Sequence, residues 1–189
     1  MKLLEDRILS EGKVRPGGIL KVDSFLNHQL DPQLLYEMAC ELKRLYEGAG
    51  VNKILTIEAS GIALAILTGY VFGCPVVFAK KSKTKNISDA LYSVDVPSFT
   101  HGNVSTVVVS KEYLGAQDRV LIVDDFLATG AALVGLKALV EQAGGSVVGA
   151  GIAIEKDFQG GGELLRAQGL RVESLARIAS MSDDSLRFC

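Results

Sequence analysis

Short apolar segments alternate with helix-length segments along most of the chain, and this order constrains the fold more than any other feature. Five apolar segments of strand length cover residues 53–57, 75–79, 119–125, 146–154 and 171–178. Helical patterns occupy residues 33–48, 60–70 and 130–145, before or between them. Strands that alternate with helices of this length indicate βαβ units and a mostly parallel sheet. Because the strands are apolar on both faces, we expect helices on both sides of the sheet.

One polar stretch departs from this order. Residues 80–113 are rich in Ser, Lys and Thr, and they alternate between apolar and polar in "VSTVVVS". We interpret this stretch as a β-hairpin flap inserted between two βα units, since long insertions in compact domains often act as lids. No repeat or interdomain linker is visible. We therefore expect a single α/β domain over residues 1–189, with a helix that begins at Asp31 and Pro32.

The composition argues against several classes of protein. The chain has 189 residues, of which 48% are hydrophobic and 22% charged, and this is typical of one globular domain. A net charge of −2 gives no sign of a nucleic-acid surface, which is usually strongly basic. The three cysteines are odd in number and form no Cys-x-x-Cys pair. We expect free thiols in a reducing compartment and no structural zinc.

The most apolar window, residues 62–79, is about long enough to span a bilayer, which requires roughly 20 residues. A threonine, two glycines and Pro75 interrupt it. A buried helix followed by a buried strand is therefore the favoured interpretation. Residues 1–12 form an amphipathic pattern that contains acids, unlike a signal peptide, so we expect no membrane association.

The loops that follow four of the predicted strands hold most of the chemically distinctive residues. These loops cover residues 58–61, 80–83, 124–132 and 155–162. In an open parallel sheet, ligands bind beyond the carboxyl ends of the strands. We therefore expect all four loops to meet at one ligand site.

The loop "ATGAA", residues 128–132, has the composition of a phosphate site. Its small residues let the backbone approach a ligand closely. The helix that follows offers free N–H groups and about half a positive charge. Thr129 adds a hydroxyl donor. A plain tight turn between strand and helix is the alternative.

Asp124 and Asp125 stand side by side at the end of a buried apolar run. They would repel each other and a phosphate unless the ligand also offers hydroxyl groups or a metal ion. A ribose offers two neighbouring hydroxyls, one for each acid, and Mg²⁺ nearby would ease the crowding. A Walker-B strand end is the alternative, but the required G-x-x-x-x-G-K-[ST] loop is absent. A dinucleotide fingerprint also fails, because Ile154 stands at its third glycine position.

The segment "VLIVDDFLATGA" resembles the phosphoribosyl diphosphate motif of the type I phosphoribosyltransferases. The resemblance implies that Asp124 and Asp125 are the catalytic acids. It also implies a phosphate-binding loop that consists of Ala128, Thr129, Gly130, Ala131 and Ala132. Many members carry Gly or Ser and then Thr where this chain has Ala131 and Ala132, so one hydroxyl contact would be missing.

Two further segments resemble the diphosphate-binding parts of the same family. "EASGI" resembles the diphosphate loop, which implies contacts from Ala59, Ser60 and Gly61 and a strained or cis peptide near Ala59–Ser60. "FAKK" resembles the next strand end, from which Lys81 would reach the diphosphate, also across a dimer interface. Lys80 is the alternative for this role.

Three segments resemble the xanthine phosphoribosyltransferases in particular: "LKVDSFLNHQLDP", "EKDFQ" and "RVESLARI". This resemblance implies a cytoplasmic homodimer of purine salvage that transfers a phosphoribosyl group to xanthine, with Mg²⁺ bound to the phosphoribosyl diphosphate. It implies base contacts from Leu20, Asn27 and Lys156. A small hood over the base would consist of residues 13–30 and the C-terminal segment.

The residue types suit this base. Xanthine carries two oxo groups, which accept hydrogen bonds from a lysine and from an amide, and Phe158 could stack on a purine. The simpler alternatives are a solvated loop lysine at Lys156, a helix-entry cap at Asn27 and a core position for Phe158. We expect no metal site made of protein ligands, since His28 and His101 have no partner at a useful spacing.

Two rival functions stay open. The first is the same transfer to guanine, hypoxanthine or adenine. The second is a regulator that senses phosphoribosyl diphosphate and binds DNA or RNA, but the chain shows neither a DNA-reading domain nor a basic composition. A flap that closes over the site would exclude water from the activated sugar.

Overall fold

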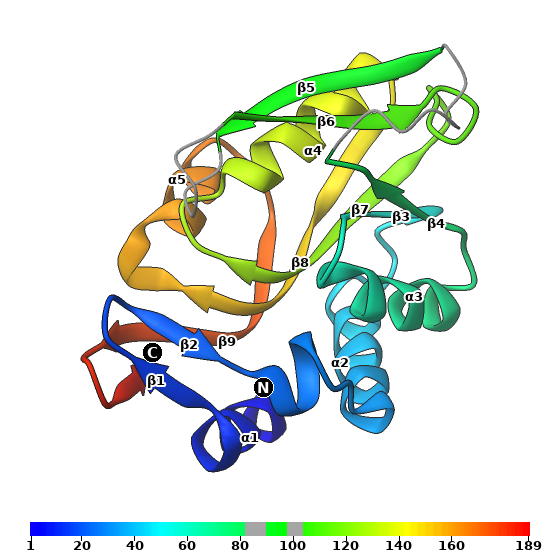
Figure 1. The fold of residues 1–189 in the computed structure, drawn as a ribbon. Helices are drawn as coiled ribbons and strands as arrows, with labels where there is room; N and C mark the ends of the chain where they lie inside the picture. Colours follow the sequence, from blue (N-terminus) through cyan, green and yellow to red (C-terminus); the bar gives the residue numbers. More distant parts are fainter. Residues whose placement is uncertain (82–89, 98–103) are drawn as a thin grey trace.

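A six-stranded sheet forms the centre of the protein in the computed structural model, which describes residues 1–81, 90–97 and 104–189 (Figure 1). The strand order is β10-β9-β8-β7-β3-β4. The strands are β3 (Lys53–Ile57), β4 (Val76–Ala79), β7 (Arg119–Leu127), β8 (Ser146–Lys156), β9 (Val172–Met181) and β10 (Leu186–Phe188). All neighbours pair in parallel except β9 and β10, which pair antiparallel. This confirms the predicted α/β class with a mostly parallel sheet.

Helices cover both faces of the sheet, as the apolar strands predicted. The α-helices are α1 (Lys2–Glu11), α2 (Pro32–Leu45), α3 (Gly61–Phe72), α4 (Ala131–Gln142) and α5 (Gly161–Ala167). Two short helices, η1 (Asp23–Asn27) and η2 (Asp157–Gln159), complete the set within the described residues. Ile54 and Leu121 belong to the core beneath α2 and α3, whereas their neighbours Leu55 and Ile122 belong to the core beneath α4. Successive strand residues therefore point to opposite faces.

The predicted cap of α2 is present. Asp31 Oδ1 accepts hydrogen bonds from the backbone N–H groups of Gln33 and Leu34, each at 3.1 Å. The helix ends at Leu45, slightly before the Gly48 that the sequence suggested. The apolar window at residues 62–79 divides into nearly all of α3 and strand β4, as predicted. Within the described residues, no helix is both long and apolar enough to cross a membrane.

A β-hairpin stands within the polar stretch that was predicted as a flap. Its strands are β5 (Leu91–Pro97) and β6 (Val104–Ser110), which pair antiparallel. Lys80 bridges to Val108, and Val96 packs against α4 at Gly135. The remaining parts of the predicted flap, residues 82–89 and 98–103, lie outside the described residues, and so does His101.

A second two-stranded sheet precedes η1 in the region of the predicted hood. It consists of β1 (Lys13–Arg15) and β2 (Ile19–Lys21). Lys156 Nζ donates a hydrogen bond to the carbonyl oxygen of Gly18, between these strands, at 2.9 Å. The end of β8 is thus tied to this region.

Strands β7, β8 and β9 extend further than the sequence suggested, and in β8 this corrects the placement of Glu155. Strand β7 continues to Leu127 and β8 to Lys156, because the two strands pair as far as Leu127 and Glu155. Asp124 and Asp125 therefore lie inside β7, in agreement with the predicted strand over residues 119–125, and the loop begins after them rather than at residue 124. Glu155 likewise lies within β8.

Candidate active site

A cavity of about 490 Å³ opens at the carboxyl edge of β3 and β7. It brings together several of the predicted site residues: Ser60, Lys81, Asp124, Asp125, Ala128, Thr129, Gly130, Ala131 and Ala132. It does not include Ala59, Gly61, Leu20, Asn27, Lys156 or Phe158 in its lining. The side of the site predicted to bind phosphate and sugar thus forms one cavity, and the predicted base residues lie outside its lining.

The predicted phosphate loop ends at the N-terminus of α4. Gly130 is the N-cap and has a φ of 87°, a left-handed conformation that side chains other than glycine rarely adopt. The N–H groups of the first helical residues have no acceptor within the helix, and Ala131, Ala132 and Leu133 line the cavity. Backbone donors and the positive end of the helix dipole therefore face the cavity.

Asp124 and Asp125 are each only 6% exposed. The backbone N–H of Asp125 donates a hydrogen bond to Asp124 Oδ1 at 3.0 Å. Burial, followed by the neighbouring charge of Asp125, raises the pKa of Asp124 well above its usual value, and the charge of Lys81 opposes this. The pair is therefore an electrostatically costly arrangement that a ligand with hydroxyl donors or a cation would relieve.

Gly61 packs directly behind Asp124 and outside the cavity lining. A Cβ on Gly61 would lie 2.6 Å from Asp124 Oδ1 and would overlap Thr56 Oγ1. Thr56 is fully buried, and its hydroxyl has no hydrogen-bond partner within the described part of the chain. No sequence signal marked Thr56, because a threonine in a strand is usually a packing residue.

Glu58 joins the ends of two neighbouring strands. Its Oε1 accepts a hydrogen bond from the backbone N–H of Lys81 at 2.6 Å. The cis peptide that the family resemblance implied near Ala59–Ser60 lies one peptide earlier, between Glu58 and Ala59. Ser60 and the Lys81 side chain reach the cavity from these two strand ends.

The structure argues against the simpler alternatives for Lys156 and Asn27. Lys156 is about half buried, hydrogen-bonded to Gly18, and lies 5.6 Å from the ring centroid of Phe126, so it is no freely solvated lysine. Burial lowers the pKa of Lys156. Asn27 ends η1, and Asp31 rather than Asn27 caps the next helix.

Phe158 and Leu20 differ in their exposure. Phe158 lies in η2 with 42% of its surface exposed, so the core alternative for this ring is wrong. Leu20 is buried in the core that includes Phe25 and Leu26. Phe126 lines the cavity and was not predicted from the sequence, because its apolar neighbours suggested only a core position.

The residues present suit a metal ion that arrives with a ligand. Among the described residues, no group of three or more His, Cys, Asp or Glu side chains is placed to hold a metal ion. The cavity offers the adjacent carboxylates of Asp124 and Asp125. Mg²⁺ is commonly held by one or two carboxylates together with substrate phosphates. The three cysteines are free, as expected.

The loop predicted to bind phosphate and the two acids of β7 line one cavity, which is the arrangement that the resemblance to the phosphoribosyltransferases implied. The sequence matches the family described as the phosphoribosyl transferase domain over residues 22–163, so the chain belongs to the phosphoribosyltransferase family. The solved structure of the APRTase from Giardia lamblia, complexed with 9-deazaadenine, has a TM-score of 0.79 and 23% identity. The match covers 92% of this chain and 97% of that one, which confirms the fold.

More similar sequences specify the group within the family. A xanthine phosphoribosyltransferase from Lachnoclostridium phytofermentans is 53% identical over 182 residues, or 96% of this chain and 94% of the relative. A xanthine phosphoribosyltransferase from Finegoldia magna is 53% identical over 188 residues, or 100% of this chain and 99% of the relative. The resemblance to this group, first seen in the motifs, is confirmed.

Proposed function

We propose that the protein transfers the phosphoribosyl group of phosphoribosyl diphosphate to N9 of xanthine, giving xanthosine 5'-monophosphate and diphosphate. The observation that carries the proposal is the shared cavity of the phosphate loop and the two buried acids, Asp124 and Asp125. The names of the most similar relatives support xanthine as the base.

The sugar phosphate would lie along the cavity in a defined direction. Its 5'-phosphate binds the backbone N–H groups of residues 130–132 at the start of α4. Its two ribose hydroxyls donate to Asp124 and Asp125. Its diphosphate then extends towards Ser60 and Lys81, where a hydroxyl and an ammonium group can donate.

The reaction exchanges one bond at C1 of the ribose. N9 of the base forms a bond to C1, the bond from C1 to the diphosphate oxygen breaks, and its electron pair leaves with the diphosphate. The proton of N9 passes to solvent. The transition state carries positive charge on the ribose, and the carboxylates of Asp124 and Asp125 are already oriented to stabilise it. Mg²⁺ bound to the substrate, next to the same two carboxylates, would neutralise charge on the leaving diphosphate.

The base would bind beyond the cavity, on the side where β8 ends. A lysine ammonium has three N–H donors. Lys156 uses one on Gly18, which leaves donors for an oxo group of xanthine. The Asn27 amide is exposed and can serve the other oxo group. Phe158 offers an exposed ring for stacking, and Leu20 would contact the base from β2.

The same proposal includes a cytoplasmic homodimer in purine salvage, a flap that closes over the sugar, and no nucleic-acid partner. Exposed apolar side chains support a subunit contact: Ile66 and Tyr70 on α3 are 53% and 77% exposed. Phe78, on edge strand β4, is 41% exposed.

An assay of base preference tests the proposal. The purified protein is mixed with phosphoribosyl diphosphate and Mg²⁺, and nucleotide formation is followed with xanthine, guanine, hypoxanthine, adenine or orotate. We expect xanthosine 5'-monophosphate to form fastest by a wide margin. A faster reaction with another base would overturn the base assignment. Binding of phosphoribosyl diphosphate without any transfer would favour the regulator.

A further inference from the structure

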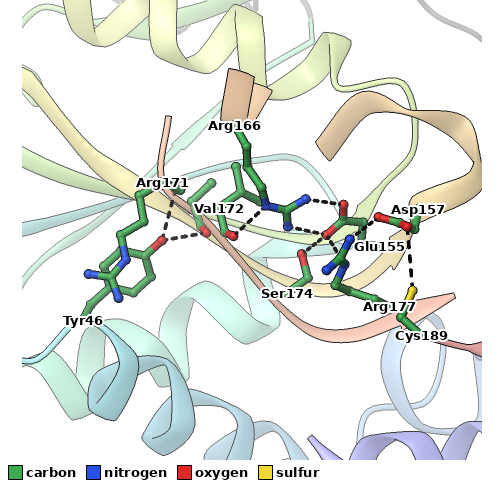
Figure 2. A network of polar contacts seen from close by, with 10 residues as sticks. Tyr46, Glu155, Asp157, Arg166, Arg171, Val172, Ser174, Arg177 and Cys189 are labelled. Carbon is green, nitrogen blue, oxygen red and sulfur yellow. Dashed lines mark hydrogen bonds and ion pairs between the residues drawn. The ribbon is translucent and has the colours of Figure 1, made fainter. Parts of the chain in front are cut away.

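Glu155 is a fully buried carboxylate at the end of β8 to which the proposed reaction assigns no role. Both of its oxygens are engaged (Figure 2). Oε1 accepts a hydrogen bond from Arg166 at 2.8 Å, and Oε2 accepts from Arg166 at 2.7 Å and from Ser174 at 2.5 Å. A buried charge is strongly unfavourable unless it is paired in this way. Glu155 thus connects β8 to α5 and to β9.

The Arg166 side of this network leads to the phosphate loop. Helix α5 begins at Gly161, which packs directly on the loop: a Cβ there would lie 2.7 Å from Gly130 N and would overlap Ala128 O. Leu165, beside Arg166 on α5, lies against Gly130 from the same side. The position of α5 therefore fixes the position of the loop, and the ion pair with Glu155 holds α5 on the sheet.

The Arg177 side leads to the loop predicted to bind the base. Arg177 Nη2 donates to Asp157 Oδ1 at 2.5 Å, and Arg177 Nε lies 3.7 Å from Glu155 Oε2. Asp157 stands in η2 between Lys156 and Phe158. Figure 2 shows Arg166 and Arg177 converging on Glu155, with Asp157 held beyond Arg177.

We propose that Glu155 is a positioning residue that sets the phosphate loop (residues 128–132) and the loop predicted to bind the base (residues 155–162), called the base loop, relative to each other. It acts on the phosphate loop through Arg166 and α5, and on the base loop through Arg177 and Asp157. This inference rests on the proposed function. Its physical reason is that transfer requires C1 and N9 at near-contact distance, where a misplacement of about 1 Å can lower the rate roughly 100-fold.

The two arginines can be tested separately, because they contact Glu155 from different elements, α5 and β9, and their side chains are 30% and 43% exposed. Arg166→Met should raise the KM for phosphoribosyl diphosphate about tenfold and leave the KM for xanthine nearly unchanged. Arg177→Met should raise the KM for xanthine by a similar factor and spare the other substrate. Glu155→Gln should raise both.

Arg171→Met is the matched control. Arg171 pairs with Glu173 at 2.9 Å and stacks on Tyr46. It is therefore an arginine with a comparable ion pair, and it lies at the left of Figure 2, away from Glu155. Both KM values should stay as in the wild type. If the three network variants lose only kcat, or if the two variants Arg166→Met and Arg177→Met affect both substrates equally, the network is merely structural and the inference is wrong.

A binding measurement separates failure of this inference from failure of the proposed function. Calorimetry of phosphoribosyl diphosphate with wild type and Arg166→Met requires no transfer to any base. Weaker binding by the variant supports the phosphate side of the inference even if the wild type forms no nucleotide. Equal binding by both proteins overturns it. If Glu155→Gln fails to fold, the two arginine variants still decide.

Discussion

The backbone N–H of Asp125 donates a hydrogen bond to Asp124 Oδ1 across 3.0 Å, which joins two neighbouring acids at the edge of the cavity. Both side chains are buried, and the pKa of Asp124 is raised by burial and by the charge beside it. The site therefore opposes folding in the absence of ligand, which is a common cost of function.

Asp124→Asn should slow transfer strongly and stabilise the free protein. The pKa of Asp124 is higher in the folded than in the unfolded state. Its contribution to stability is therefore lost as the pH rises above the pKa of an unfolded aspartate, and the loss persists at neutral pH. Removing the charge should raise the unfolding midpoint at pH 7 by at least about 2 °C and lower kcat at least about 100-fold. Scanning calorimetry at pH 4 and pH 7 checks this. A lower midpoint at pH 7 would contradict it.

Gly61→Ala should displace the Asp124 side chain, because Gly61 packs against it on the side away from the cavity. The new methyl group would lie 2.6 Å from Asp124 Oδ1, so the helix start or the acid must shift. We expect a loss of about 1–3 kcal/mol in the free energy of unfolding and a higher KM for phosphoribosyl diphosphate. Gly115→Ala is the control, because nothing lies within 4 Å of a Cβ there. Equal effects at the two positions would disprove the packing argument.

Lys156→Met should weaken the use of xanthine without changing the binding of phosphoribosyl diphosphate. The change keeps an apolar stem of similar length but removes the ammonium group, which lies over the Phe126 ring and donates to Gly18. We expect kcat/KM for xanthine to fall at least about 100-fold, because an oxo group loses its donor, while the affinity for phosphoribosyl diphosphate stays the same. Steady-state kinetics with each substrate varied in turn measures both. If only the affinity for phosphoribosyl diphosphate changed, Lys156 would not be a base-binding residue.

Phe158→Ala should weaken the binding of xanthine without changing the stability of the fold. The ring is 42% exposed, so its loss should change the free energy of unfolding by no more than about 0.5 kcal/mol. The KM for xanthine should rise several-fold as stacking is lost. Denaturant unfolding and kinetics are compared on the same preparation. Unaltered kinetics would remove Phe158 from the base site.

The order of the five parallel strands and of helices α2, α3 and α4 could be predicted, because each of these elements carries a local signal. Asp31 and Pro32 mark the start of α2, and the run at residues 53–57 coincides with β3. The ends of β7 and β8 could not be predicted in the same way. They continue because each strand pairs with the other, and that pairing depends on residues far apart in the sequence.

The residues of the candidate site also divide into those that are adjacent in the sequence, which could be predicted, and those that only folding brings together. Asp124, Asp125 and the loop at residues 128–132 form one contiguous segment, and it lines the cavity. Glu155 escaped prediction because its partners Arg166, Ser174 and Arg177 are 11 to 22 positions away along the chain. Thr56 escaped because its proximity to Asp124 arises only when β3 and β7 pair.

A crystal structure of the protein with xanthosine 5'-monophosphate tests the central claim most directly. We predict that the phosphate accepts hydrogen bonds of about 3 Å from the backbone N–H groups of residues 130–132. The ribose hydroxyls should donate to Asp124 and Asp125, and the base should contact Lys156. A nucleotide bound with its phosphate at Lys81, or with its base away from Lys156, would contradict the proposed site.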